Sequence, residues 1–438
     1  MVNFKASAIE YPLLRDFHAA MPKSPDIAVS QNQAINTRKG RLSNIGITGG
    51  KRTFFVINTK TQLALPHEIQ AELFYQSDAL SVWLPEGYNM SNSLIFDDCI
   101  QRIETIVLPR IENLWGKSAD IDGDGRIALL FSHTLNDEQV AIGFFNPSDF
   151  FKRNEDTHSD AYNYASNEMD IIYVAIPDTE PNSSYSLQNV IATIAHELTH
   201  ACTFTSKTYN RILNGDSNAK REDLFLDEGL SHLTENLCGF GVSGGNVRFL
   251  KRFLEDTSMY SLCGPNRIGQ NDSAGMRGAM TLFLSWLFWK SGGMSWDASN
   301  QILLNDKGGI LFLRKLANSA KTGLDNIENS FGKPVYLLFN EMLDEINRYR
   351  MTGRSFNYIT DPITNEAVDF FVNMGALHYS DNAEPVIIGF PVSGSAYGAN
   401  TLLPWSFIFF DPFTNNNDML LTIKATKNNG GVFFACSN

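Results

Sequence analysis

The sequence predicts an α+β fold, because strand-like and helix-like patterns occupy different parts of the chain. Short runs rich in β-branched and aromatic residues mark the first hundred residues and the last eighty. Apolar residues recur at helical spacing through most of the stretch between 186 and 350. A chain of 438 residues is too long for one ordinary core. We therefore expect an N-terminal arm and β region at 1–92, a central domain at 93–354 and a small C-terminal β domain at 355–438.

The elements follow in order along the chain. The first forty residues are polar and mixed, so we expect an irregular segment or an extended arm there. A long helix over 93–115, with a bend near Pro109, separates two groups of strands. The strands expected before and after it are 53–57, 80–84, 127–131, 140–145 and 169–174. They predict a small β-sheet half of the central domain and a sheet before it.

A helical half follows, and the strand pattern then returns. One helix is expected to begin near Ser186, and further helices are expected near 224–238, 244–256, 276–291, 309–319 and 333–349. The strands expected in the C-terminal region lie at 385–390, 406–410 and 419–423. Ser186 is suited to be the N-cap of the first helix.

Composition narrows the class of protein. A hydrophobic content of 43% with 19% charged residues is typical of a soluble globular protein. The net charge of −13 argues against nucleic acid or an anionic membrane as the main partner. The longest apolar run, 278–289, is too short to span a bilayer. The first residues lack the apolar stretch of a signal peptide, which leaves a cytoplasmic protein or a trimmed mature form. The five cysteines show no C-x-x-C spacing, although one disulfide could form.

The most informative motif is His196-Glu197-Leu198-Thr199-His200. On a helix, the i, i+4 spacing places both imidazoles on one face, where they can hold one cation. Catalytic zinc takes three protein ligands, and two histidines with one glutamate form one such set. Glu228, in the stretch Asp227-Glu228-Gly229-Leu230, is the candidate third ligand. The alternatives are a chance match on an amphipathic helix and, for Glu228, a glutamate favoured by the helix dipole.

A second candidate metal site lies in the acidic stretch 120–127. Asp120, Asp122 and Asp124 occupy positions 1, 3 and 5 of a calcium loop, and Gly125 occupies position 6. Position 12 is Phe131, not the glutamate that a calcium loop uses as its bidentate ligand. We therefore favour a tight acidic turn that leads into a strand, with Ca²⁺ as the alternative.

The stretch 241–245 matches the G-x-S-x-G pattern of serine hydrolases, with Ser243 at the nucleophile position. A nucleophile elbow requires a strand before it and a helix after it. Helices are expected on both sides here, so a helix-to-helix loop is the favoured interpretation.

The zinc motif with Asp227-Glu228-Gly229-Leu230-Ser231 resembles the gluzincin metallopeptidases, whose third ligand is a glutamate on a second helix. A metzincin would need glycine at 203 and histidine at 206, where this chain has Thr203 and Ser206. The layout of residues 50–350 is also similar to the hyicolysin family of bacterial peptidases. The residues that carry this likeness are Asp122–Ile127, Gly143–Phe145, Ser166–Tyr173 and the zinc motif.

The resemblance implies a thermolysin-like zincin domain that hydrolyses peptide bonds, with Zn²⁺ on His196, His200 and Glu228 and with Glu197 as general base. It also implies an extracellular or cell-envelope location. The chain departs from thermolysin-like members at His232, where a carboxylate commonly orients the first zinc histidine. Glu235, one turn further on, could take that role.

Two questions stay open at this level. The donor that stabilises the transition state could be any of Tyr260, His232, His378 and Tyr397. The alternative function is a catalytically inactive surface or adhesion protein that keeps zinc for its structure. If His232 were a fourth ligand, the site would be closed, as structural zinc sites are. The oligomeric state and the substrate sequence are not indicated.

Overall fold

The computed structural model describes residues 50–60, 65–88, 93–180, 183–255, 257–258, 260–263, 273–352, 359–369, 392–393, 405, 407 and 409–410. The chain forms two compact units and crosses between them three times, twice inside a helix and once in a loop. Unit 1 comprises 1–97 and 120–194, and unit 2 comprises 98–119 and 195–438. Helices and strands are both present in quantity, which confirms the α+β class. The domain boundaries at 92 and 354 stay predictions.

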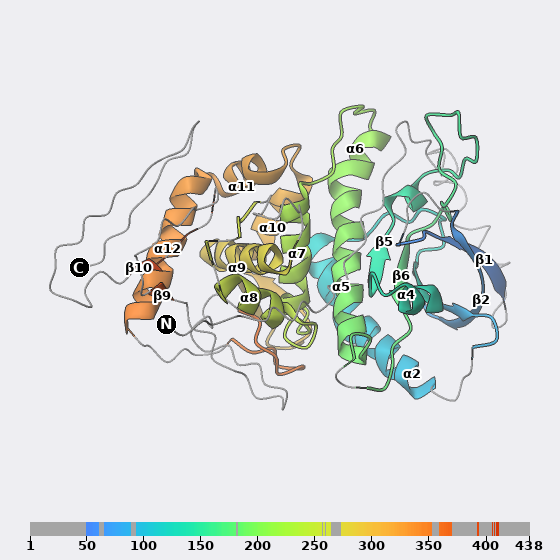
Figure 1. Cartoon of the computed structure of the whole chain (residues 1–438), viewed down its shortest axis with the longest axis horizontal. Coiled ribbons are helices and arrows are strands. Elements are labelled where there is room, and N and C mark those ends of the chain that lie inside the picture. Colours follow the sequence, from blue (N-terminus) through green and yellow to red (C-terminus); the bar gives the residue numbers. More distant parts are fainter. Residues whose placement is uncertain are drawn as a thin grey trace, which may run out of the picture. The chain divides into compact units, whose positions relative to one another are not determined.

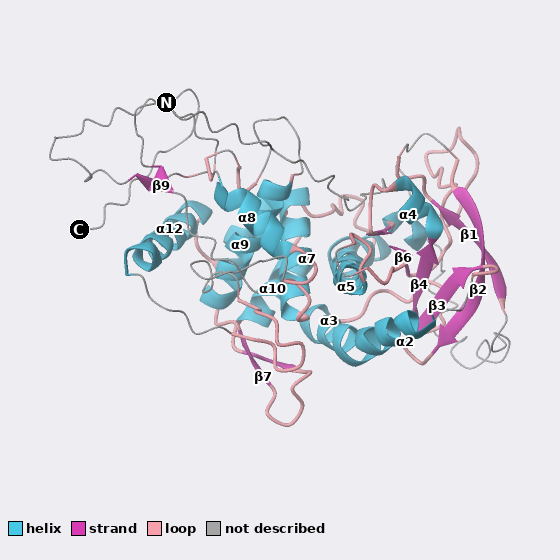
Figure 2. Ribbon diagram, turned by 60° about the horizontal axis from the view of Figure 1, so that its bottom comes forward, coloured by secondary structure: helices cyan, strands magenta, loops and turns pink. Residues whose placement is uncertain are grey.

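Unit 1 is built on a six-stranded mixed sheet, whose strands are drawn in magenta in Figure 2. The strands are β1 (Lys51–Val56), β2 (His67–Gln76), β3 (Leu80–Pro85), β4 (Ile127–Ser132), β5 (Gly143–Phe145) and β6 (Ile171–Ala175). Their spatial order is β1-β2-β3-β4-β6-β5. The β3–β4 and β4–β6 pairs are parallel, whereas the other pairs are antiparallel.

The core of unit 1 lies on one face of this sheet. β4 and β6 are central and parallel, and nearly all of their side chains are buried, as expected for strands covered on both faces. Alternate residues of neighbouring strands point to the same face and form one apolar cluster. Its members on the strands are Phe54, Val56, Ile69, Ala71, Leu73, Trp83, Ala128, Leu130, Phe144, Ile171, Tyr173 and Ala175.

The strands expected at 53–57, 80–84, 127–131 and 169–174 are confirmed within one or two residues. The run 140–145 is strand only over Gly143–Phe145. Strand β2 was not expected from the sequence, although the buried residues of β2 alternate with polar ones. Short helical segments α4 (His133–Glu138) and η3 (Pro147–Phe150) were not anticipated either.

The acidic stretch forms the tight turn that we favoured. The backbone N–H groups of Gly125 and Arg126 donate to Asp120 Oδ1 (3.1 Å) and Asp124 Oδ1 (2.7 Å), so the loop folds back on its own carboxylates. The structure adds a residue that the sequence did not indicate. Asp170, next to β6, lies with Asp120 and Asp122 in a group whose oxygens are all within 4.8 Å of one another. These three carboxylates could hold a metal ion, and the identity of such an ion stays a prediction.

A buried polar network supports the same unit. Tyr173 Oη donates to Asp149 Oδ2 at 2.7 Å, and the backbone N–H of Asn167 donates to Asp149 Oδ1 at 2.6 Å. The Asn167 amide also pairs with the backbone N–H and C=O of Phe55, both at 2.9 Å. Burial raises the pKa of Asp149 to about 7, although these hydrogen bonds oppose the increase.

Unit 2 is mainly helical (Figure 1). Its helices are the end of α5 (Leu187–Phe204), then η4 (Thr205–Tyr209), α6 (Asn210–Leu213), α7 (Leu224–Leu237), α8 (Asn246–Glu255), α9 (Ala274–Lys290), α10 (Gly309–Asn318), α11 (Gly323–Phe331) and α12 (Val335–Thr352). It also holds a hairpin of β7 (Met294–Trp296) and β8 (Leu304–Asp306). All the helices expected here are confirmed, while α11 was not anticipated. No described helix is long and apolar enough to span a membrane.

The helix expected over 93–115 is three consecutive segments. These are α2 (Ser93–Arg102), the π-helical turn η2 (Ile103–Val107) and α3 (Leu108–Trp115). Pro109 lies in the first turn of α3, where its missing N–H leaves no intrahelical bond unmade. The irregular turn therefore precedes the proline.

Glycines allow α7, α8 and α9 to pack closely. A Cβ atom on Gly278 of α9 would lie 2.0 Å from the backbone oxygen of Phe249 on α8. A Cβ on Gly229 of α7 would lie 3.0 Å from the Met280 Cβ of α9. A larger residue at 278 would therefore force the two backbones apart. Helix α9 consequently lies directly against the helix that carries Glu228.

Ser243 lies in the loop between α7 and α8, so the helix-to-helix interpretation is confirmed. Cys99, Cys202, Cys238 and Cys263 form no disulfide with one another. A two-residue parallel pair, β9 (Val392–Ser393) with β10 (Phe409–Phe410), is described in the C-terminal region. The expected N-terminal arm, Cys436 and the strands at 385–390 and 419–423 lie outside the described residues.

Candidate metal centre

Helix α5 carries the zinc motif. It begins immediately after Ser186, whose Oγ accepts the N–H of Asn189 at 3.5 Å, so the predicted N-cap is confirmed. His196 and His200 are one turn apart, and their ring centroids are separated by 4.8 Å. Both side chains are almost completely buried. The motif therefore lies within the packed interior of the protein, and both imidazoles lie on one side of α5.

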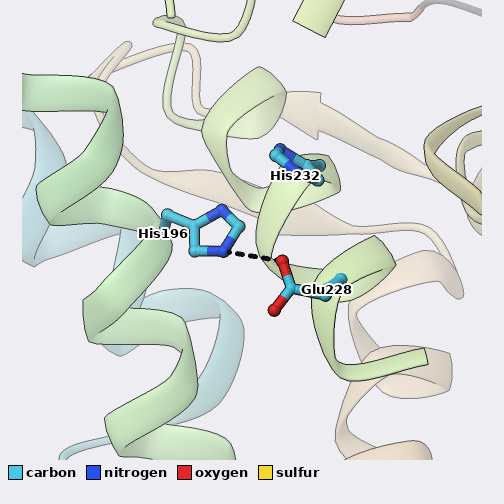
Figure 3. A group of neighbouring side chains, drawn as sticks. All are labelled: His196, Glu228 and His232. Carbon is cyan, nitrogen blue, oxygen red and sulfur yellow. Dashed lines mark ion pairs between the residues drawn. The ribbon is translucent and has the colours of Figure 1, made fainter. Parts of the chain in front are cut away.

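Glu228 of α7 lies opposite these two histidines. Its Oε2 is 3.4 Å from His196 Nε2, and its Oε1 is 3.6 Å from His200 Nε2. Figure 3 shows the first of these contacts as a dashed line. Two donor atoms that share one tetrahedral zinc at about 2.1 Å lie about 3.4 Å apart. Each separation is close to that value, and each histidine faces a different oxygen of Glu228.

Each histidine is oriented by a carboxylate behind it. His196 Nδ1 donates to Glu235 Oε1 at 2.6 Å, and His200 Nδ1 is 3.2 Å from Asp227 Oδ1. An imidazole that gives its Nδ1 proton to a carboxylate keeps the Nε2 lone pair for a metal. Because Nε2 is the atom facing Glu228 in both rings, the tautomers suit metal binding. Glu235 is placed to orient His196, as expected, whereas the contact of Asp227 with His200 was not expected.

Glu235 also holds a second imidazole. Its Oε1 lies 2.8 Å from His232 Nδ1, on the same helix. Burial opposes ionisation of Glu235, but the charge of His232 and the hydrogen bonds from both histidines outweigh it and keep the pKa below its ordinary value. One carboxylate oxygen thus orients His196 and His232 together.

His232 lies close to the candidate ligands. Histidine nitrogens of His196 and His232 and a carboxylate oxygen of Glu228 all lie within 4.8 Å of one another (Figure 3). This compact group does not include His200, which is near Glu228 through the 3.6 Å contact alone. The three residues of this group could hold an ion, and His200 lies beside the group.

Arg277 of α9 completes the centre and was missed in the sequence. Its Nη1 is 3.1 Å from Glu228 Oε2 and 3.4 Å from His232 Nε2. The side chain is 2% exposed, and its guanidinium also lies 5.9 Å from the centre of the Phe249 ring. One signal was available in the sequence, since Arg277 is the single charged residue at the start of the apolar run 278–289.

The predicted general base and the candidate donors for the transition state are considered next to these ligands. Glu197, the predicted general base, is 1% exposed and lies on α5 between the two histidines. Tyr260 is buried against Gly275, where a Cβ would come within 2.4 Å of its ring. His378 and Tyr397 lie outside the described residues. Of the four donors considered for the transition state, His232 is the one that the structure places beside Glu228.

The candidate ligands, Glu235, Asp227 and Arg277 all belong to unit 2. Two imidazoles and one carboxylate, each imidazole backed by a further carboxylate, could hold a metal ion. No protein-family model matches the sequence, and a comparison with curated proteins gives no match either.

Proposed function

We propose that the protein is a zinc-dependent peptidase. In this proposal His196, His200 and Glu228 hold one Zn²⁺, and Glu197 is the general base. The observation that carries it is the orientation of the two imidazoles. Both turn Nδ1 toward a carboxylate and Nε2 toward Glu228, and the Nε2-to-oxygen distances of 3.4 and 3.6 Å match ligands of one ion.

The chemistry follows from these positions. When bound, zinc lowers the pKa of a coordinated water toward 7 and polarises the scissile carbonyl. Glu197 accepts a proton from the attacking water and then delivers it to the leaving amine. Glu235 keeps His196 in the correct tautomer throughout.

The finer fold and family assignments belong to the same proposal. A thermolysin-like zincin domain of the gluzincin type would have a small sheet, a helix with the zinc motif and a second helix with the glutamate. The sheet β1–β6, helix α5 and helix α7 occur here in that order. The resemblance to the hyicolysin peptidases, and with it an extracellular or envelope location, is supported by the sequence motifs alone.

An inactive zinc-containing surface protein is the second candidate. It would be favoured if His232 ligated the ion and closed the site. The contacts of His232 favour the open site instead. Its Nδ1 faces Glu235 at 2.8 Å, and its Nε2 lies 3.4 Å from Arg277 Nη1. Both ring nitrogens therefore already face protein groups, which leaves a position on the ion for water.

The test combines metal content with cleavage of a mixed peptide library, read by mass spectrometry. Wild type should carry one zinc per chain and cut peptides. Glu197→Gln should keep the zinc and lose turnover, because an amide cannot act as the base. His200→Ala should lose the metal, because it removes a ligand. The matched controls are Glu255→Gln and His158→Ala, whose side chains are 48% and 93% exposed.

Each outcome separates the candidates. Cleavage by the wild type and both controls, but not by Glu197→Gln, supports the peptidase. Retained cleavage in Glu197→Gln would contradict the assigned base. Tight zinc without cleavage by the wild type would favour the inactive protein. Cleavage that survives complete removal of the metal would contradict the zinc mechanism.

A further inference from the structure

A group of three carboxylates lies in unit 1, outside the candidate metal centre. Asp120 and Asp122 belong to the acidic turn that precedes β4, and Asp170 directly precedes β6. One oxygen of each residue lies within 4.8 Å of an oxygen of each of the others. The candidate zinc ligands belong to unit 2. The three aspartates therefore share no residue with the candidate metal centre, and the proposed function gives them no role.

Asp170 is the member of this group that a solvated surface turn does not explain. Its side chain is 5% exposed, and buried carboxylates in proteins are paired with a cation or bind a metal. The Oδ1 atom accepts the backbone N–H of Ile121 at 3.1 Å. Among the described residues, the ion pair of this turn joins Arg126 to Asp124 and leaves Asp170 without a cation. A buried carboxylate that faces two further carboxylates is costly unless a cation lies between them.

The position of Asp170 also compensates for the carboxylate that the calcium-loop pattern lacks. Such a loop takes its last carboxylate from position 12, which here is Phe131, a fully buried residue of β4. Strands β4 and β6 are parallel neighbours, with Ala128 opposite Ile171. The N–H of Ala128 donates to the backbone oxygen of Asp170 at 2.9 Å, which holds Asp170 at the end of the acidic turn. The missing carboxylate is thus replaced by one from the neighbouring strand.

The donor atoms of the group favour a particular class of ion. All three are carboxylate oxygens, which suit hard cations such as Ca²⁺ and Mg²⁺. Ca²⁺ accepts about six to eight oxygen ligands in flexible geometry, whereas Mg²⁺ requires a nearly ideal octahedron and loses its water reluctantly. Asp120 is exposed, so water can complete the coordination of a larger ion. The spacing of Asp120 and Asp122 is also that of positions 1 and 3 of a calcium loop. These features favour Ca²⁺.

We propose that Asp120, Asp122 and Asp170 bind one Ca²⁺ in a site that stabilises the sheet of unit 1. The ion connects the turn before β4 to the start of β6, the two central parallel strands. The three carboxylates come together only when these strands pair, so the ion binds the folded chain and not the unfolded one. A ligand with this preference stabilises the folded state. The proposal does not depend on zinc binding or on peptidase activity.

The first test is calorimetric titration of the full-length protein with CaCl₂ in calcium-free buffer. We expect about one Ca²⁺ per chain, with a dissociation constant of about 1 mM or lower. MgCl₂ should bind several-fold more weakly, because Mg²⁺ fits this donor set less well. Absence of saturable binding of CaCl₂ up to about 10 mM would overturn the proposal. Equal affinity for MgCl₂ would overturn the choice of Ca²⁺.

The second test replaces Asp170 by asparagine, which keeps an oxygen for the N–H of Ile121 and removes the charge. Asp170→Asn should weaken Ca²⁺ binding roughly 10-fold or more and should lose most of the rise in melting temperature that CaCl₂ causes. In calcium-free buffer the variant should melt at the wild-type temperature or above it, because fewer like charges repel. The matched control is Asp156→Asn, whose side chain is 65% exposed and which should respond to CaCl₂ as the wild type does.

The comparison with and without CaCl₂ distinguishes a calcium ligand from a purely structural residue. A variant that is destabilised by the same amount in both buffers would show a structural role and would overturn the proposal. Wild-type affinity for Ca²⁺ in folded Asp170→Asn would also overturn it. If Asp170→Asn does not fold, Asp122→Asn provides the same comparison at a less buried position.

A crystal structure of the wild-type protein with CaCl₂ requires no variant. The expected result is one Ca²⁺ at about 2.3–2.6 Å from an oxygen of each of Asp120, Asp122 and Asp170. An ion that contacts the turn but not Asp170, or the absence of an ion at millimolar CaCl₂, would overturn the proposal.

Discussion

Replacement of Glu235 by glutamine tests the architecture of the centre most directly. The carboxylate accepts a hydrogen bond from His196 at 2.6 Å, and the same oxygen lies 2.8 Å from His232 Nδ1. A glutamine has nearly the same shape but is neutral. A hydrogen bond to a charged group contributes about 1.5–3 kcal/mol, and one between neutral groups contributes about 1 kcal/mol. The substitution therefore weakens each contact by roughly 1–2 kcal/mol.

The size of the effect depends on how many imidazoles bind the metal. If His196 alone is a ligand, Glu235→Gln should weaken zinc binding about 5-fold to 30-fold, which overlaps the range of about 10–100-fold known for such supporting residues. If His232 is also a ligand, the losses at both rings combine, and zinc binding should weaken by roughly 100-fold or more. We expect the smaller value, because His232 Nε2 faces Arg277.

The assay is competition for zinc between the protein and a chromophoric chelator of known affinity. Wild type, Glu235→Gln and the exposed control Glu255→Gln are compared at one pH, after circular dichroism has shown that each is folded. An unchanged zinc affinity in folded Glu235→Gln would refute the claim that Glu235 orients His196. A loss in the larger range would instead identify His232 as a ligand and favour a closed site.

Three further predictions concern stability. Gly278→Ala should lower the free energy of unfolding by about 1–3 kcal/mol or more, because its Cβ meets the Phe249 backbone oxygen at 2.0 Å, and an unchanged melting temperature would contradict this. Asp149→Asn should abolish a pH dependence. The pKa of about 7 in the folded protein exceeds the ordinary 3.8, so the contribution of Asp149 to wild-type stability should be largest below pH 4 and fall by up to roughly 4 kcal/mol as pH rises to 7. Denaturant titrations of the variant should lack this component. Lys207→Met should lower the free energy of unfolding by about 3–5 kcal/mol, because it leaves the buried Glu222 without its cation, which lies 2.8 Å away in the wild type. Adding Glu222→Leu should recover most of this loss. Equal stability of the single and double variants would argue against an ion-pair effect.

The sequence predicted the structure best where the pattern involves residues that are close together in the chain. The spacing of His196 and His200 requires only a helix, and the helix could be recognised from its apolar positions and its N-cap. The central strands β4 and β6 were found because buried parallel strands are nearly continuous apolar runs. β2 was missed, although its residues alternate correctly. Its exposed positions carry glutamate and glutamine, which have low strand propensity.

The rest of the centre depends on contacts between distant segments. Arg277 is 49 positions beyond Glu228, and the packing of α9 brings the two together. Asp170 similarly joins an acidic turn that begins fifty positions earlier. No spacing rule relates such pairs in a single sequence. A lone charge next to an apolar helix was the available signal for Arg277, and it indicated burial without identifying the partner.

Every candidate ligand of the centre, and each residue that supports one, comes from unit 2. Occupancy of the centre and folding of that unit are therefore linked, and a ligand present at a thousand times its dissociation constant adds about 4 kcal/mol to stability. For the proposed zinc protein, the metal supply would then set how long the molecule survives as well as how fast it works. Chelation would expose the chain to unfolding and to other proteases.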